Sequence, residues 1–294
     1  MTILSIRDLT KTYGKVTALQ NLNLDIEAGN IYGILGPNGS GKTTTLGIIL
    51  GILEADSGTY EWFGGQYGDH HRLRIGSILE TPNFYPYMSG YDNLKIVSMI
   101  RNVQDPNLDQ LLKMVNLENR GKSKFRTYSL GMKQRLAIAA TLIGDPEVVI
   151  FDEPTNGLDP QGIAEVRQIL QRIADSGKTV IMASHILDEV EKICTHVAII
   201  KFGELKMTGP IGSIITNDYF IEMRAQDQEA LKSWILTQNF KKTFEEKKKH
   251  YEISVDAGFP VEEFNKIAFE NGHILTHLVI RNRSLEEDFL EITA

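Results

Sequence analysis

The stretch from Gly36 to Thr44 constrains the fold of this chain more than any other feature. It reads Gly-Pro-Asn-Gly-Ser-Gly-Lys-Thr-Thr and contains the full pattern G-x-x-x-x-G-K-[ST]. An apolar, strand-like run at 30–35 precedes it, and residues with the i, i+3, i+4, i+7 spacing of a helix follow: Leu46, Ile49, Leu50 and Leu53. A strand, a glycine-rich loop and a helix in this order form a P-loop. The sequence therefore predicts an α/β fold that binds a nucleoside triphosphate.

The loop residues are candidate ligands of the nucleotide. Glycines allow successive backbone N–H groups to turn toward phosphate oxygens, where side chains would clash. Lys42 would bring a cation to the β- and γ-phosphates, and the Thr43 hydroxyl can complete a Mg²⁺ shell. The N-terminus of the following helix also favours an anion. The predicted nucleotide-binding residues here are Gly36, Pro37, Asn38, Gly39, Ser40, Gly41, Lys42, Thr43 and Thr44.

A pair of carboxylates follows a second buried strand. Residues 148–151 are all apolar and mostly β-branched, which is typical of a strand buried on both faces of a parallel sheet. Asp152 and Glu153 come directly after it. A lone pair of acids in this position is usually an ordinary polar turn. Because a P-loop lies upstream, we interpret these acids as part of the site, since α/β folds bind ligands at the carboxyl ends of their strands.

Two further residues are candidates that have structural alternatives. His185 follows a predicted buried strand at 179–183, and an isolated histidine at a strand end is more often structural than functional. Here the strand comes after the acid-bearing one, which favours a phosphate-sensing role. Tyr13 lies between two predicted strands, and it is either a platform for a flat ligand or a turn residue that packs on the sheet.

The pattern also predicts the domain organisation. Residues from about 89 to 143 are helical, which indicates a helical subdomain inserted in the α/β core. Ser129 begins one of these helices as an N-cap, and a free helix N-terminus is also an anion site. The composition changes near 209–217. We therefore expect an ATP-binding domain at 1–215 and a small α+β domain of βαββαβ-like order at 216–294.

Composition excludes several classes of protein. The formal net charge of −7 argues against a general nucleic-acid-binding protein. The sequence lacks an apolar run long enough to span a membrane, and its first residues lack the apolar core of a secretion signal. A single cysteine, Cys194, fits a reducing compartment. These features indicate a cytosolic α/β protein.

Taken together, the motifs resemble the ATP-binding subunit of an ABC transporter over about residues 1–215. The matching segments are Walker A at Gly36–Thr43, the signature at Tyr128–Met132, Walker B at Val148–Glu153, the D-loop at Gly157–Asp159, the switch histidine His185 and the adenine-stacking Tyr13. The resemblance implies an ATP hydrolase with Mg²⁺. Asp152 would hold Mg²⁺ through its water shell, Glu153 would polarise the attacking water, and His185 would contact the γ-phosphate.

The family resemblance also implies a dimer of ATPase subunits. Two copies would face head to tail, with ATP between the P-loop of one copy and the signature helix of the other. In this arrangement Ser129, Gly131 and Asp159 join the nucleotide-binding residues. The dimer would drive a separate integral membrane permease from the cytoplasmic face of the membrane, as a peripheral protein.

Two departures from the family pattern narrow the resemblance. After the predicted strand at 73–79 the chain carries Glu80 where the family normally has glutamine, which would add a catalytic and metal-binding carboxylate. The signature carries Leu130 and Met132 in place of glycine and glutamine. These features, and the tail Leu285–Leu290, resemble bacitracin-resistance and lantibiotic-immunity exporters. We expect Glu80→Gln to keep ATP binding but change metal dependence or coupling.

The predicted function is therefore to power export of an antimicrobial peptide or another hydrophobic compound, although import stays open. One alternative is a soluble ABC ATPase that acts on ribosomes or DNA, but the chain has neither two cassettes nor a long coiled-coil insertion. A regulatory module without turnover is the other alternative, and the intact acids argue against it. The aromatic residues Phe84, Tyr85 and Tyr87 are interpreted equally as a permease-docking surface or as internal packing.

Overall fold

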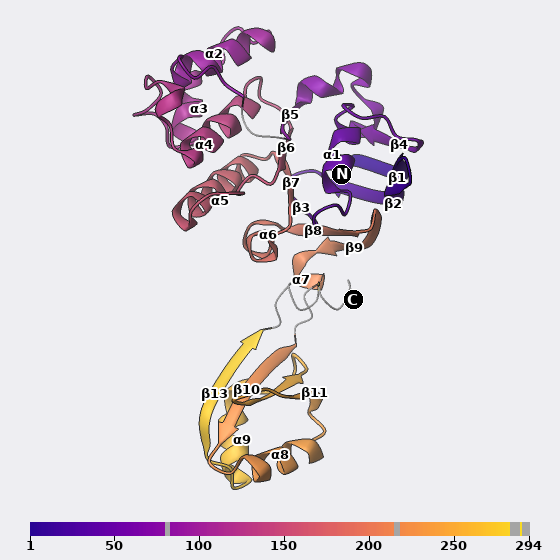
Figure 1. Ribbon diagram of the computed structural model, residues 1–294, viewed down its shortest axis with the longest axis vertical. Helices are drawn as coiled ribbons and strands as arrows, with labels where there is room; N and C mark the ends of the chain where they lie inside the picture. The colour runs from indigo at the N-terminus through magenta and orange to yellow at the C-terminus, as the bar shows by residue number, and fades with distance from the viewer. Residues whose placement is uncertain (80–82, 215–217, 283–288, 290–294) are drawn as a thin grey trace. The chain divides into compact units, whose positions relative to one another are not determined.

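The computed structural model describes residues 1–79, 83–214, 218–282 and 289 (Figure 1). Its backbone contacts divide the chain into two compact units, residues 1–211 and 212–292. Each unit has its own hydrophobic core. Among the described residues, no helix is both long enough and apolar enough to span a membrane.

The N-terminal unit is built around a six-stranded sheet. In spatial order its strands are β5 (Ile75–Ile78), β6 (Val148–Asp152), β7 (Thr179–Ser184), β3 (Ile31–Leu35), β8 (His196–Lys201) and β9 (Glu204–Pro210). All pairs are parallel except β8 with β9. Strands β3 and β7 are buried along their whole length, as their continuous apolar runs predict. Strand β5 is shorter than the predicted 73–79, because residues 73 and 74 end a 3₁₀ helix.

A second, three-stranded antiparallel sheet completes the α/β core of this unit. Its order is β2 (Val16–Glu27), β1 (Thr2–Tyr13) and β4 (Ser57–Trp62). Strands β1 and β2 form a hairpin, so Tyr13 ends a strand next to its turn. The apolar side chains of both sheets form one buried cluster with helix α1 (Lys42–Ile49). This packing fixes the loop that joins β3 to α1.

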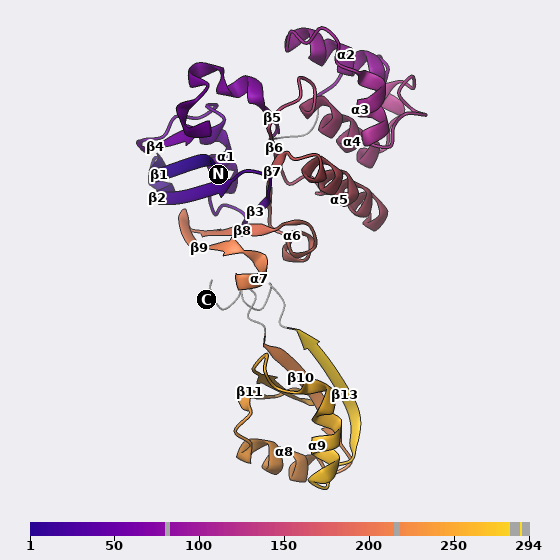
Figure 2. The same ribbon diagram turned by 180° about the vertical axis from the view of Figure 1, so that it is seen from behind.

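The remaining helices of this unit lie between the strands in sequence. They are α2 (Gly90–Ile100), α3 (Leu108–Met114), α4 (Leu130–Thr141), α5 (Pro160–Asp175) and α6 (Leu187–Ile193), with the short helix α7 (Ile211–Ile214) at its boundary. Helices α2, α3 and α4 group together in both views (Figures 1 and 2). They fall within the segment 89–143 for which the sequence predicts a helical insertion.

The C-terminal unit is a four-stranded antiparallel sheet with two helices (Figure 2). In spatial order its strands are β11 (Lys241–Glu246), β12 (Tyr251–Val255), β10 (Tyr219–Ala225) and β13 (Leu275–Asn282), and its helices are α8 (Gln228–Thr237) and α9 (Phe264–Glu270). The order along the chain is the predicted βαββαβ. Alternate residues of β10 and β12, such as Ile221 and Ile253, pack against Leu231 and Phe264 of the helices.

Candidate nucleotide-binding site

The loop between β3 and α1 has the backbone geometry that its glycines predict. Gly39 and Gly41 have φ angles of +80° and +111°, which side chains rarely tolerate. A Cβ on Gly36 would lie 2.2 Å from the carbonyl oxygen of Ile200, so only glycine fits there. Helix α1 begins directly at Lys42. The loop therefore directs backbone N–H groups and a helix N-terminus to one place.

Lys42 is held inside this loop by its own backbone. Its side chain is only 6% exposed, and Nζ donates to the carbonyl oxygens of Gly36 at 2.8 Å and Pro37 at 3.2 Å. Burial lowers the pKa of Lys42, and the carboxylates of Glu153 and Asp152 oppose that shift. Glu153 Oε1 lies 3.9 Å from Nζ. A buried cation beside the loop is suited to bind an anionic group.

Asp152, at the end of β6, faces the start of α1. The Thr43 hydroxyl donates to Asp152 Oδ2 at 2.6 Å. The other oxygen, Oδ1, is buried and has no hydrogen-bond partner among the described residues. Burial raises the pKa of Asp152, while the Thr43 hydrogen bond lowers it. The arrangement leaves one buried carboxylate oxygen available for a further ligand.

Glu153 lies one residue beyond the strand, with a left-handed backbone φ of +49°. Its N–H donates to the carbonyl oxygen of Ala183 at 3.0 Å, which fixes this strained turn against β7. Oε1 lies 2.9 Å from His185 Nδ1, and Oε2 is buried without a hydrogen-bond partner among the described residues. The two strand ends thus bring a carboxylate and an imidazole into direct contact.

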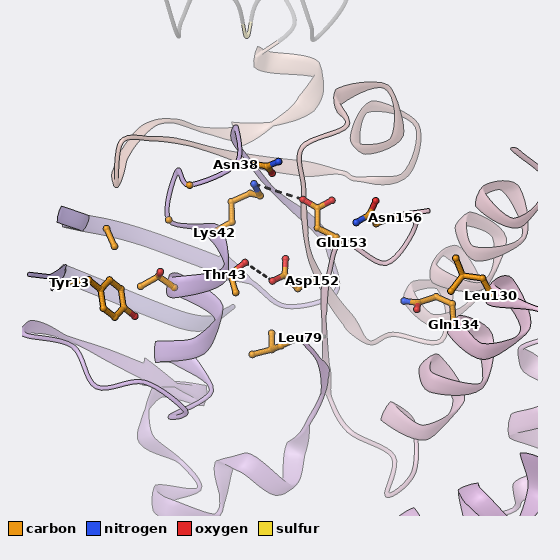
Figure 3. Close-up of a pocket in the computed structure, with 14 residues that line it drawn as sticks. Tyr13, Asn38, Lys42, Thr43, Leu79, Leu130, Gln134, Asp152, Glu153 and Asn156 are labelled. Carbon is orange, nitrogen blue, oxygen red and sulfur yellow. Dashed lines mark hydrogen bonds and ion pairs between the residues drawn. The ribbon is translucent and has the colours of Figure 1, made fainter. Parts of the chain in front are cut away.

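These residues share one cavity of about 510 Å³ (Figure 3). The predicted residues that line it are Tyr13, Asn38, Gly39, Gly41, Lys42, Thr43, Thr44, Asp152 and Glu153. Gly36, Pro37 and Ser40 belong to the same loop but do not line the cavity. His185 is not a lining residue, but it contacts Glu153, which lines the cavity. Glu80 lies outside the described residues, although the preceding Leu79 lines the cavity.

Other lining residues were not predicted as parts of the site. They are Ala18, Leu79, Leu130, Gln134 and Asn156. Leu130 and Gln134 belong to α4, and Figure 3 shows their side chains across from the P-loop residues. Leu130 occupies the position where the signature departs from the family pattern. That departure was the one feature of the sequence that could have indicated a lining residue here.

Ser129, Gly131 and Asp159 lie together, but not in this cavity. Ser129 is the N-cap of α4, accepting from the Met132 N–H at 3.3 Å, and Asp159 caps α5, accepting from the Gly162 N–H at 2.8 Å. All three predicted residues line a separate hollow of about 420 Å³. Within one chain, therefore, Ser129 and Gly131 do not line the cavity that holds Lys42, although Leu130 between them lines both hollows.

A network that the sequence did not reveal holds Tyr13 in place. Asp56 accepts hydrogen bonds from the N–H and hydroxyl of Thr12, both at 2.6 Å, and from Lys11 Nζ at 2.9 Å. These bonds lower the Asp56 pKa to about 2. Tyr13 lies 47% exposed at the rim of the cavity, with Lys11 Nζ 5.6 Å from its ring centre. This position is compatible with a platform for a flat ring, and the stacking role of Tyr13 stays a prediction.

Phe84, Tyr85 and Tyr87 were predicted either to dock a permease or to pack internally, and their surroundings in the structure differ. Phe84 packs edge-on against Phe125, with ring centres 5.2 Å apart. Tyr85 and Tyr87 are 48% and 66% exposed. Internal packing therefore applies to Phe84, and the two tyrosines form the exposed part of the patch.

Comparisons with known proteins agree with this geometry. A family model described as "ABC transporter" matches residues 19–156. The chain is 36% identical to the bacitracin transport ATP-binding protein BcrA of Bacillus licheniformis, over 99% of this chain and 97% of that protein. It is 42% identical to the lantibiotic transport ATP-binding protein SrtF of Streptococcus pyogenes, over 69% of this chain and 89% of SrtF.

A solved structure shows the same fold for the N-terminal part. It is cbiO1 from Clostridium perfringens, described as part of the ABC transporter complex cbiONQ, with 30% identity and a TM-score of 0.66. The match covers 72% of this chain and 90% of cbiO1. The chain therefore belongs to the ATP-binding proteins of ABC transporters and is an ABC-type ATPase.

Proposed function

We propose that this chain hydrolyses ATP to power a separate membrane permease that exports a peptide antibiotic of the bacitracin or lantibiotic kind. The observation that carries the proposal is its similarity to BcrA over 99% of the chain, including the C-terminal unit. The complete set of Lys42, Asp152 and Glu153 in one cavity supports turnover rather than a regulatory role.

The cofactors of this proposal are ATP and Mg²⁺. A hydroxyl and a carboxylate are the hard oxygen donors that Mg²⁺ prefers. Asp152 Oδ1, which no residue in the described part of the chain hydrogen-bonds, fits such an ion beside Thr43. Bound Mg²⁺ would neutralise charge on the phosphates. Lys42 and the loop N–H groups would bind the phosphate oxygens, and Tyr13 would stack on the adenine. Glu80 stays a predicted metal ligand.

Glu153 is the proposed general base. Its Oε2 has no hydrogen-bond partner among the described residues, and it would accept a proton from a water molecule that attacks the γ-phosphate. The His185 contact to Oε1 would keep that carboxylate turned toward the phosphate site. His185 is therefore proposed to position Glu153. It would also contact the γ-phosphate when nucleotide is bound.

The site is proposed to be completed by a second copy of the chain. Ser129, Gly131 and Asp159 line a hollow of their own, apart from the cavity of Lys42. A head-to-tail dimer would bring these residues of one copy to the P-loop of the other. The backbone donors at the start of α4 would then bind phosphate from the opposite side.

The proposed location is the cytoplasmic face of the membrane, where the chain would be a peripheral partner of an integral permease. The exposed Tyr85 and Tyr87 are the candidate docking side chains. Nucleic acid is not an expected partner, because the net charge is −7.

The test is to express tagged Glu153→Gln protein in the native cell, solubilise the membranes, and identify what co-purifies with ATP present. The variant should trap the ATP-bound complex and bring down an integral membrane protein in near-equal amount. Glu118→Gln, a matched change at an exposed glutamate, should not enrich it. Ribosomes, nucleic acid or a dimer alone would support the soluble alternative instead.

The cargo is tested separately by deleting the gene and measuring growth with bacitracin and with a lantibiotic. Sensitivity to either should rise and should be restored by the wild-type chain but not by Glu153→Gln. A co-purified permease with unchanged resistance would leave the transport role in place and contradict the peptide cargo.

A further inference from the structure

The sheet of the C-terminal unit has two chemically different faces. The face with Ile221, Met223 and Ile253 packs against α8 and α9. In a strand, neighbouring side chains point to opposite faces, so Glu222 and Glu252 belong to the other face. They are directly paired across β10 and β12. Their pairing puts two carboxylates at one point on the face away from the helices.

Two histidines reach the same point from different parts of the chain. His250 lies directly before β12. His277 belongs to β13 and pairs with Arg224 of β10. His250 Nε2 and His277 Nε2 lie 3.7 Å and 3.8 Å from a single atom, Glu222 Oε2. Their ring centres are 5.9 Å apart. Both distances to Glu222 exceed hydrogen-bond length, so the oxygen lies between two imidazole nitrogens without a close bond to either.

Arg281 holds the carboxylates in this orientation. It donates to Glu222 Oε1 at 3.3 Å and to Glu252 Oε2 at 2.8 Å. The contact with Glu222 occupies Oε1 and leaves Oε2 for the histidines. Such outer contacts orient ligands in metal sites. The Glu252 side chain is only 8% exposed, and its second oxygen lies 3.6 Å from Lys247 Nζ.

We propose that Glu222, His250 and Glu252, joined by His277, bind a divalent transition metal of the Zn²⁺ type. Ligand atoms of the first three lie within 4.8 Å of one another. In a tetrahedral Zn²⁺ site with bonds of about 2.1 Å, ligand atoms lie about 3.4 Å apart. The two distances from Glu222 Oε2, 3.7 Å to His250 and 3.8 Å to His277, are close to this value, so each histidine needs only a small movement to share an ion with that oxygen.

The ligand types decide which ion fits. Two imidazole nitrogens favour Zn²⁺ and its transition-metal neighbours, whereas Mg²⁺ and Ca²⁺ prefer oxygen alone. Arg281 and Lys247 balance the charges of the two glutamates. The selectivity for a transition metal would therefore come from the histidines. Lys247, on a flexible stem and 3.6 Å from Glu252 Oε1, is the cation that binding would displace. The site is independent of the ATP chemistry.

The test is a Zn²⁺ titration of the full-length, tag-free chain without nucleotide, in competition with a chromophoric chelator. The wild type should retain about one Zn²⁺ per chain. His250→Ala and His277→Ala should each weaken binding at least about tenfold, as loss of a ligand or its support does. His70→Ala, a matched change at an exposed histidine of the N-terminal unit, should bind like the wild type.

Far-UV circular dichroism checks that each variant folds, and Glu222→Gln replaces any histidine variant that does not. Zn²⁺ bound at Asp152 would be unaffected by these changes and is therefore distinguished. Absence of Zn²⁺ binding by the wild type would overturn the proposal. Equal affinity in the wild type and in the double variant His250→Ala/His277→Ala would also overturn it.

Discussion

The two units of this chain place their polar residues on different parts of a sheet. In the N-terminal unit Lys42, Asp152 and His185 follow the carboxyl ends of parallel strands, where loops and a helix N-terminus attract an anion. In the C-terminal unit Glu222 and His250 meet on the face of an antiparallel sheet, where carboxylates and imidazoles attract a cation. We therefore expect a change at one site to alter the binding of that site's ligand and to leave binding at the other site unchanged.

The largest expected effect on nucleotide binding comes from removing the buried cation of the first site. Lys42→Ala should weaken ATP binding by roughly thirtyfold or more, since a hydrogen bond to a charged group contributes about 2 kcal/mol. Zn²⁺ binding should not change. Calorimetry with ATP and the Zn²⁺ titration measure both, and Lys122→Ala at an exposed position is the control. A parallel loss of both ligands would contradict the independence of the two units.

An effect on turnover rather than on binding is expected from His185, which we propose positions the general base Glu153. His185→Ala should lower kcat about tenfold to a hundredfold, which corresponds to about 1.5 to 3 kcal/mol for a hydrogen bond to a charged group. KM for ATP should change little, and His185→Gln should partly restore kcat. Steady-state ATPase assays separate kcat from KM. An increase in KM alone would instead assign His185 to nucleotide binding.

Stability of the N-terminal unit should depend on a buried pair behind the site. The Thr155 hydroxyl donates to Glu189, and the two residues are 2% and 3% exposed. Thr155→Val should cost about 1 to 3 kcal/mol, because it leaves a buried acceptor without its donor. Denaturant unfolding followed by Trp62 fluorescence, in a Trp234→Phe background, confines the measurement to this unit.

The control for that change is Thr17→Val at an exposed position of β2. It should alter the unfolding midpoint by much less than Thr155→Val. Equal shifts in the two variants would mean that the buried hydrogen bond adds nothing to stability.

The smallest effect is expected at Asp56, whose pKa is lowered from 3.8 to about 2 by bonds from Thr12 and Lys11. A carboxylate with a depressed native pKa stabilises the fold above its unfolded pKa of about 4 and loses this effect as pH falls toward 2. Wild type should therefore be slightly more stable than Asp56→Asn at pH 7. The difference should shrink between pH 4 and pH 2, and a constant difference would contradict the assignment.

The sequence predicted most of the nucleotide site because its residues are consecutive. Gly36 to Thr43 form one loop, and Asp152 and Glu153 follow one strand, so spacing alone places them. Strand β4 was missed because only Trp62 of its six residues is buried, so pairing with β1 rather than an apolar run defines the strand. Asn156 and Gln134 were missed as lining residues because each becomes part of the cavity only through the fold.

The C-terminal cluster could not be predicted in this way. Glu222, His250 and His277 are far apart in the chain and carry no recognisable spacing. The register of β10 with β12 and β13 brings Glu222, Glu252 and His277 to one face, and His250 directly precedes β12. A shift of one residue in that register would send each side chain to the opposite face.

The most direct test of the central claim is the ATPase rate of Glu153→Gln beside wild type and Glu118→Gln. We expect Glu153→Gln to lower kcat by about a hundredfold to ten-thousandfold, the usual contribution of a general base. Its ATP affinity should stay near that of the wild type, because Lys42 and the P-loop are intact, and Glu118→Gln should turn over normally. Brisk hydrolysis by Glu153→Gln would contradict the assignment of the site.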